Sequence, residues 1–276
     1  MARSVSVRAA VLALGTGVLV TGLSACGASA GDDKHPDHRS FALHGRTLTV
    51  DTDNAAIELV AARGNKQGDK QASKQANEQG DKQGDKADAV RVTRWFDGSV
   101  AIGSGPTLSW SLDGDRLVLR EHCSGLFADC SARYRVEVPS GIGVRVVDGS
   151  GDVRASGFTA ALGIRTSNGD VHVTDSSGPL DLQSDNGAVR AEVTSRRVRA
   201  EDSNGAVDLE LGAVPDTVDA HSDNGAVTVT LPRSEYHVTA ESDNGAVSVG
   251  VSQRDRSPHR VTADSANGKV TVRNPN

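Results

Sequence analysis

Acidic side chains recur beside Asn-Gly pairs in the second half of this 276-residue chain. Asp185, Asp223 and Asp243 each precede the Asn directly, and Asp202 stands one place earlier. Oxygen ligands brought together at such positions suit Ca²⁺, so these four residues are candidate calcium ligands. Asp and Asn also stabilise turns by bonding to their own backbone, which is the competing interpretation. We expect no required cofactor, and calcium is the one that the pattern leaves open.

A second set of candidate metal ligands lies three places before the Asn of each pair. Glu201, His221, Glu241 and Asp264 hold this position in four of the repeats. These residues are expected on successive, adjacent repeats, which would let Glu201, His221 and Glu241 share a transition-metal ion. The alternative is a solvated column in which His221 separates like charges.

Paired surface carboxylates could also serve a polysaccharide-acting enzyme. Asp208 and Glu210 with Arg190, or Asp219 with Arg199, could form such an arrangement. These residues are, however, ordinary outward positions of an alternating strand. No nucleophile elbow or phosphate-cradling loop is present in the sequence. We therefore expect that the protein is not an enzyme.

The Asn-Gly pairs themselves form an internal repeat. Their glycines follow one another at intervals of 18, 18, 20, 20 and 23 residues. A nearly constant period of this length indicates a repeat architecture. We interpret the pairs as structural corners, which are Asn168-Gly169, Asn186-Gly187, Asn204-Gly205, Asn224-Gly225, Asn244-Gly245 and Asn267-Gly268.

Each repeat carries two runs of alternating apolar residues. After the corner come side chains such as Val189, Ala191 and Val193, and before the next corner come Val198 and Ala200. A period of two with β-branched residues predicts strands. Each repeat, here called a rung, should therefore contain two strands joined by an Asn-Gly corner.

Two topologies could use these strands. Asn-Gly favours a tight hairpin turn and thus an antiparallel meander, whereas a parallel stack would place each Asn on the Asn of the next rung, about 4.8 Å away. The repeated phase of the corners favours the stack, with Gly supplying a positive φ. We predict an all-β fold, in which residues 141–276 form a parallel β-solenoid of 18–20-residue rungs.

The preceding region is less regular. Residues 41–140 should form an N-terminal β cap that protects the first edge of the solenoid. Within it, residues 52–59 look like a divergent rung with Ala in place of the corner Gly, and residues 65–87 are a low-complexity Lys/Gln/Gly/Asp insert.

The start of the chain predicts export. Arg3 and Arg8 precede and flank an apolar run at residues 9–20 that is too short to span a membrane comfortably. Leu23-Ser24-Ala25-Cys26 resembles the bacterial lipobox. This resemblance implies a signal peptide at residues 1–25, lipidation of Cys26 and a flexible tether at residues 26–40. An ordinary signal cleaved near Ala30 is the alternative.

Composition restricts the partners. The formal charge is −6, and removal of residues 1–25 would change it to −8. Such an acidic chain argues against nucleic acid as a partner. Once Cys26 is lipidated, Cys123 and Cys130 remain as an even pair in an oxidising compartment, and we expect them to form a disulfide.

The whole pattern resembles the putative-adhesin domain of unknown function found in bacterial surface lipoproteins. The resemblance rests on Val136-Glu137-Val138-Pro139, on Ser150-Gly151-Asp152-Val153 and on the repeated corners. It implies a parallel β-solenoid on the outer face of the envelope, with no assigned catalytic residue or ligand.

We therefore expect a surface-tethered, non-catalytic structural or adhesin-like binding module. It would be lipid-anchored to the cell membrane on the extracytoplasmic side, with an envelope polymer or a protein as its partner. The alternative function is an envelope-stress or drug-sensing accessory protein of a membrane signalling system.

Overall fold

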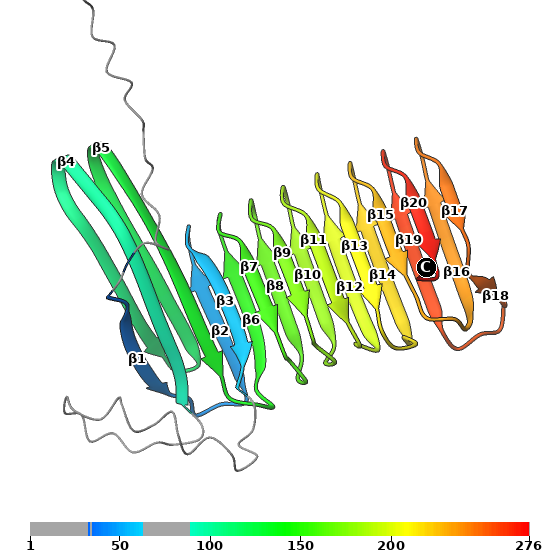
Figure 1. The fold of residues 1–276 in the computed structure, drawn as a ribbon, viewed down its shortest axis with the longest axis horizontal. Helices are drawn as coiled ribbons and strands as arrows, with labels where there is room; N and C mark the ends of the chain where they lie inside the picture. The colour runs from blue at the N-terminus through cyan, green and yellow to red at the C-terminus, as the bar shows by residue number, and fades with distance from the viewer. Residues whose placement is uncertain (1–32, 34, 63–88, 276) are drawn as a thin grey trace, which may run out of the picture.

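The computed structural model describes residue 33, residues 35–62 and residues 89–275. These residues form one elongated stack of strands (Figure 1). No helix occurs in these ranges, and so none that is long and apolar enough to cross a membrane. The strands are β1 (Asp37–Ala42), β2 (Thr47–Thr52), β3 (Ala56–Ala61), β4 (Ala89–Asp113), β5 (Arg116–Val138), β6 (Gly143–Asp148), β7 (Val153–Ser156), β8 (Leu162–Thr166), β9 (Val171–Thr174), β10 (Leu180–Ser184), β11 (Val189–Val193), β12 (Arg197–Asp202), β13 (Val207–Leu211), β14 (Thr217–Ser222), β15 (Val227–Thr230), β16 (Glu235–Ser242), β17 (Val247–Val249), β18 (Ser252–Gln253), β19 (Arg260–Ser265) and β20 (Val270–Arg273).

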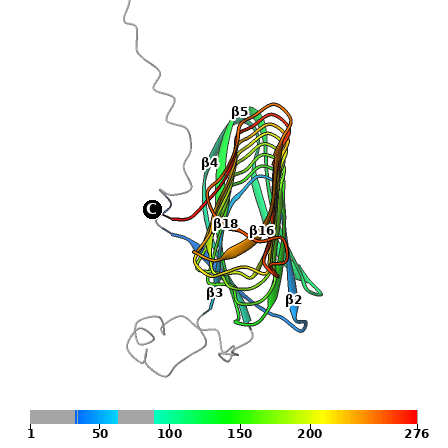
Figure 2. The same cartoon turned by 90° about the vertical axis from the view of Figure 1, so that its right-hand side faces the viewer.

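Each rung contributes one strand to each of two facing sheets (Figure 2). In the rung β10–β11, for example, the chain crosses from one sheet to the other through an Asn-Gly corner. Neighbouring rungs pair in parallel, with Leu180 opposite Val198 and Val189 opposite Val207. The all-β parallel solenoid is therefore confirmed, and the antiparallel meander is wrong.

The core lies between the two sheets. The first inward position after each corner is a valine, and Val189, Val207 and Val227 are 0% exposed. On the opposite sheet, the small side chains of Ala200 and Ala220 are also fully buried. Alternation of apolar and polar residues thus places apolar columns on the inner face of each sheet and leaves the polar columns outside.

The rungs do not stack in sequence order. The last rung of the chain, β19–β20, lies between β14–β15 and β16–β17, because β19 pairs with both β14 and β16. The expectation that consecutive repeats are neighbours is wrong at this end. Near the N-terminus, the rung β2–β3 likewise lies between β5 and β6–β7. The parallel stack thus begins at Thr47, well before the boundary at residue 141.

The β4–β5 ribbon closes the N-terminal end of the stack. The start of β5 pairs with β2 and its end pairs with β3, so this single strand supplies both sides of a rung. Within β5, Cys123 and Cys130 form a disulfide with a Cα–Cα distance of 6.5 Å. β4 pairs antiparallel along β5, and β1 pairs antiparallel with the start of β4.

Several predicted features lie outside the described residues. These are the signal peptide, Cys26, the greater part of the tether and the insert at residues 65–87. They stay predictions.

Candidate binding surface

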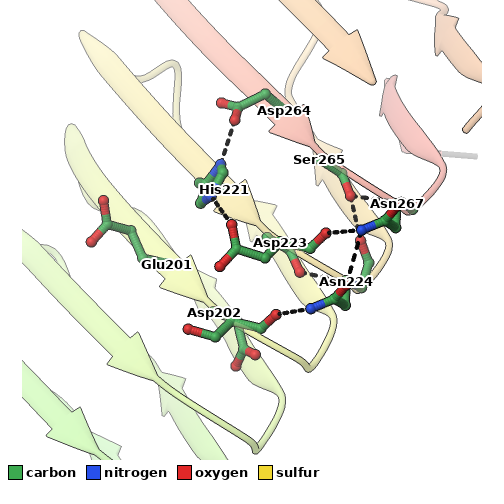
Figure 3. Close-up of polar contacts among 12 residues, drawn as sticks. Glu201, Asp202, His221, Asp223, Asn224, Asp264, Ser265 and Asn267 are labelled. Atoms are coloured by element: carbon green, nitrogen blue, oxygen red, sulfur yellow. Dashed lines mark hydrogen bonds and ion pairs between the residues drawn. The ribbon is translucent and has the colours of Figure 1, made fainter. Parts of the chain in front are cut away.

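The corner asparagines form a continuous ladder. From Asn186 onward, each Nδ2 donates to the Oδ1 of the Asn on the neighbouring rung, at 2.9 Å from Asn204 to Asn186 and 3.0 Å from Asn224 to Asn204. The ladder continues across the inserted rung, from Asn267 to Asn224 (Figure 3) and from Asn244 to Asn267. The amides are therefore used to hold the stack together.

A hydroxyl or carboxylate two places before each Asn completes the corner. Ser184 Oγ accepts a hydrogen bond from the amide of Gly187 at 2.9 Å and donates to the carbonyl of Gly169 at 3.1 Å. Asp202 holds the same position, is 3% exposed, and its Oδ1 accepts from the amide of Asn204 at 2.8 Å. Asp202 is therefore a buried corner group and not an exposed ligand.

The corner glycines are required by a close backbone approach. None of the six has a positive φ, so our explanation from left-handed backbone is wrong. A Cβ added to Gly187 would instead lie closer than 3.0 Å to the carbonyl oxygen of Gly169 on the neighbouring rung. Both explanations demand Gly at this position, so the sequence could not separate them.

The remaining corner acids stay on the surface. Asp185, Asp223 and Asp243 are exposed, and Asp202 is turned into the corner. Within the described ranges, no group of three or more His, Cys, Asp or Glu side chains is arranged to hold a metal ion. The stacking therefore does not bring the four predicted calcium ligands together.

The predicted metal column has a different order from the one expected. Because the rung β19–β20 is inserted, the column runs Glu201, His221, Asp264, Glu241. Glu241 is not adjacent to His221, so the proposed ligand set of Glu201, His221 and Glu241 is not assembled. The Glu201 carboxylate also lies apart from the imidazole (Figure 3), because it binds Arg199 Nε at 3.0 Å and Gln183 Nε2 at 2.7 Å.

His221 is held between two carboxylates. Its Nδ1 contacts Asp264 Oδ2, and its Nε2 lies 3.0 Å from Asp223 Oδ1 (Figure 3). Partial burial lowers the pKa of His221, but the hydrogen bonds and charges of Asp264 and Asp223 outweigh that effect and raise it. The protonated ring can donate to both acids, which makes this contact a clamp between β14 and the inserted β19.

The residues considered for catalysis are separated into surface columns. Arg190 lies 3.6 Å from Asp170 on the neighbouring rung, and Arg199 is bound by Glu201. Asp208 and Glu210 are exposed on β13. Along one outward column of the other sheet, charges of opposite sign alternate at rung spacing, with Asp181 opposite Arg199 and Arg199 opposite Asp219. This is a flat polar surface.

The buried carboxylate of Asp148 was not predicted from the sequence. Asp148 is 4% exposed, and one of its carboxylate oxygens has no hydrogen-bond partner. It occupies the same corner column as Thr166 and Ser184 on the next two rungs. Its alignment with Ser and Thr in the repeat was the signal that could have identified it.

One solved structure supports this architecture. A chain from Bacteroides fragilis, described as a putative adhesin, has a similar structure, with a TM-score of 0.52 and 15% sequence identity over 88% of this chain and 98% of that chain. At this identity the match supports the fold alone. A cell adhesion protein from Clostridium sporogenes, also described as putative, matches with a TM-score of 0.35 and 12% identity over 87% of this chain and 100% of that chain.

The search of curated proteins returned no match. The family model described as Toastrack DUF4097 matches residues 142–274. This confirms the resemblance to an adhesin-type repeat domain of unknown function. The repeat region of this chain, residues 142–274, is therefore similar to the Toastrack DUF4097 domain.

Proposed function

We propose that this protein is a surface-tethered, non-catalytic binding module of the bacterial cell envelope. One observation carries the proposal: the polar groups that could do chemistry are used within the corners or spread over flat charged columns. The outward face thus offers many weak contacts at regular spacing, which suits a repetitive polymer or an extended protein surface.

The depressions on this surface are open to solvent. The one beside the start of β16 has a volume of about 510 Å³ and is lined by side chains that include Glu235, Arg254 and His259. The one beside the His221 column has a volume of about 200 Å³ and is lined by side chains that include Asp264, Glu241 and Asp243. A small-molecule site normally encloses most of its ligand in a mostly apolar cavity, and neither of these depressions is enclosed. The described surface therefore favours recognition of a macromolecule.

The tether is the second part of the proposal. Cys26 stands eleven positions before β1 at Asp37, and β1 lies at the end of the stack that the β4–β5 ribbon closes (Figure 1). Lipidation at Cys26 would hold this end at the membrane and direct the other end outward. The Bacteroides fragilis chain of similar fold is described as a putative adhesin, and we extend that description to this protein.

Two experiments test this function. Labelled palmitate should be incorporated by the wild-type chain in cells and not by the Cys26→Ser variant. The unlipidated chain should also bind purified envelope polymer or intact cells, with and without a calcium chelator. Binding that survives chelation supports the flat polar surface as the recognition face. Failure to bind any envelope fraction or cell would refute the adhesin-like function.

A further inference from the structure

The N-terminal end of the stack is closed by polar and aromatic contacts. The Arg94 guanidinium lies 4.4 Å from the ring centroid of Trp110, and its Nη2 binds Asp37 Oδ2 at 2.6 Å. β1 also pairs along the start of β4 over six residues. β1 therefore covers the edge of β4 from Ala89 to Arg94.

The C-terminal end of the stack is open. The rung β16–β17 is the last in space (Figure 1), and Val247 is 43% exposed, although Val227 and Val270 in the same column are 0% exposed. Val238 and Ala240 on β16 are also partly exposed, whereas their neighbours on β19 are buried. The apolar columns thus end at a surface where a further rung would continue them.

Only part of this end is covered by the chain itself. β18 pairs with the first two residues of β16, Glu235 and Tyr236, and the carbonyl of Asp255 accepts a hydrogen bond from His237 at 2.9 Å. Over the described part of the chain, no strand pairs with the outer edge of residues 238–242. Unpaired backbone groups at such an edge are a template for another strand.

Charges of opposite sign lie at the two ends of this edge. Glu241 and Asp243 are exposed at the end of β16. The start of β16 is net positive, with three exposed arginines and two exposed acids, which are Arg233, Arg254, Arg256, Glu235 and Asp255. Charges can also protect an edge from pairing, but protection does not require that the two signs be separated along the strand.

This separation selects the orientation of a partner. In an antiparallel alignment of two copies, the basic start of one β16 lies against the acidic end of the other. A parallel alignment would place like charges together, which is unfavourable. Two identical edges paired antiparallel are related by a two-fold axis, so the contact between basic start and acidic end forms twice in one closed dimer.

We propose that the C-terminal edge binds the same edge of a second copy of this chain, antiparallel and centred on Ala240. Ala240 is the middle of the free stretch 238–242, and the pairing would bury Val238 and Val247. The inference rests on the proposed function in one respect: with the opposite end tethered, the dimer would join molecules on two cells.

The test uses the unlipidated chain from Gly27 onward, which contains every described residue. Sedimentation equilibrium should show a monomer–dimer equilibrium at concentrations up to about 1 mM, the range of weak specific association. Glu241→Arg with Asp243→Arg should weaken the dimer by at least roughly tenfold, and Arg254→Glu with Arg256→Glu should do the same. A mixture of the two variants should restore a heterodimer, because each supplies the charge that the other lacks.

A cross-link tests the register. Ala240→Cys should give a disulfide-linked dimer under oxidising conditions, because the two-fold axis places this residue opposite itself. Ala220→Cys is the matched control: it has the same column position on the inner strand β14 and should give none. A chain that stays monomeric, or charge reversals without effect or rescue, would overturn the inference. A monomer that still binds envelopes would leave the proposed function intact.

Discussion

The buried carboxyl group of Asp148 should make the stability of this solenoid depend on pH. Its Oδ2 accepts a hydrogen bond from the amide of Gly151 at 2.6 Å and one from Thr166 Oγ1 at 3.2 Å, while Oδ1 has no partner. Burial raises the pKa of Asp148 from 3.8 to about 6, against the opposing effect of these hydrogen bonds. The next rungs avoid this cost because they carry Thr166 and Ser184 at the same position.

The sign follows from the raised pKa. The protonated form is favoured in the folded state, so this group stabilises the fold below pH 3.8, and the contribution is lost as the pH rises through about 6. A shift of this size corresponds to about 3 kcal/mol in total. Asp148→Thr should remove the titration and keep the hydroxyl that the corner uses. Its advantage over the wild type should grow by roughly 2 kcal/mol between pH 4 and pH 7.5.

Urea unfolding of both proteins across this pH range measures the difference. The free energies of unfolding should diverge as the pH rises, and the Asp148 carboxyl carbon should titrate near pH 6 by NMR. Asp181→Asn, at an exposed outward position, is the control, and its free energy of unfolding should change with pH as that of the wild type does. If the free energy of unfolding of Asp148→Thr also changes with pH as that of the wild type does, the reasoning about the burial of Asp148 is refuted.

His221→Gln should lower the melting temperature more at pH 6 than at pH 9. Because the pKa of His221 is raised in the folded protein, its ion pairs stabilise the fold at low pH, and this contribution is lost as the pH rises through that pKa. The side chain is 38% exposed, so the effect on the free energy of unfolding should stay below about 1 kcal/mol. Thr228→Cys should form a disulfide with Thr271→Cys, its direct neighbour, and not with Ser248→Cys. Gly187→Ala should cost more than about 2 kcal/mol in urea unfolding, because its Cβ would clash with the neighbouring backbone.

For each of these three predictions, a specific result would contradict it. Gly212→Ala is the control for the glycine, since its added Cβ would come no closer than 3.4 Å to another atom; equal costs at Gly187 and Gly212 would contradict the close-approach argument. A disulfide between Thr228→Cys and Ser248→Cys would show that the rungs stack in sequence order. An effect of His221→Gln that increases at high pH would reverse the assigned charge state of the clamp.

Much of the repeat region could be predicted from local pattern. The period of the Asn-Gly pairs, the alternation around Val189 and the identity of the corner residues all depend on interactions between one rung and a nearly identical neighbour. The Asn ladder and the inward valines follow from that similarity, because identical side chains stack favourably in parallel strands. This is why the solenoid, its register and its inward columns were correct.

The order of the rungs could not be predicted, for the same reason. β16 and β19 present the same inward pattern, Val238 with Ala240 and Val261 with Ala263, so either could lie beside β14. Particular tertiary contacts distinguish the two arrangements, among them the clamp between His221 and Asp264. Those contacts join residues 43 positions apart and leave no periodic signal in the sequence.

For the candidate sites too, properties of a single rung could be predicted, whereas properties that depend on the order of the rungs could not. The sequence by itself determined that acids and amides would line the corners and that the outward columns would be charged, because these are properties of a single rung. Only the tertiary structure decided that Asp202 and Asp148 are buried, that Glu241 is separated from His221, and that one end of the stack is closed while the other is open. Burial and separation depend on which rung lies next to which, and that choice is made by the packing of the whole chain.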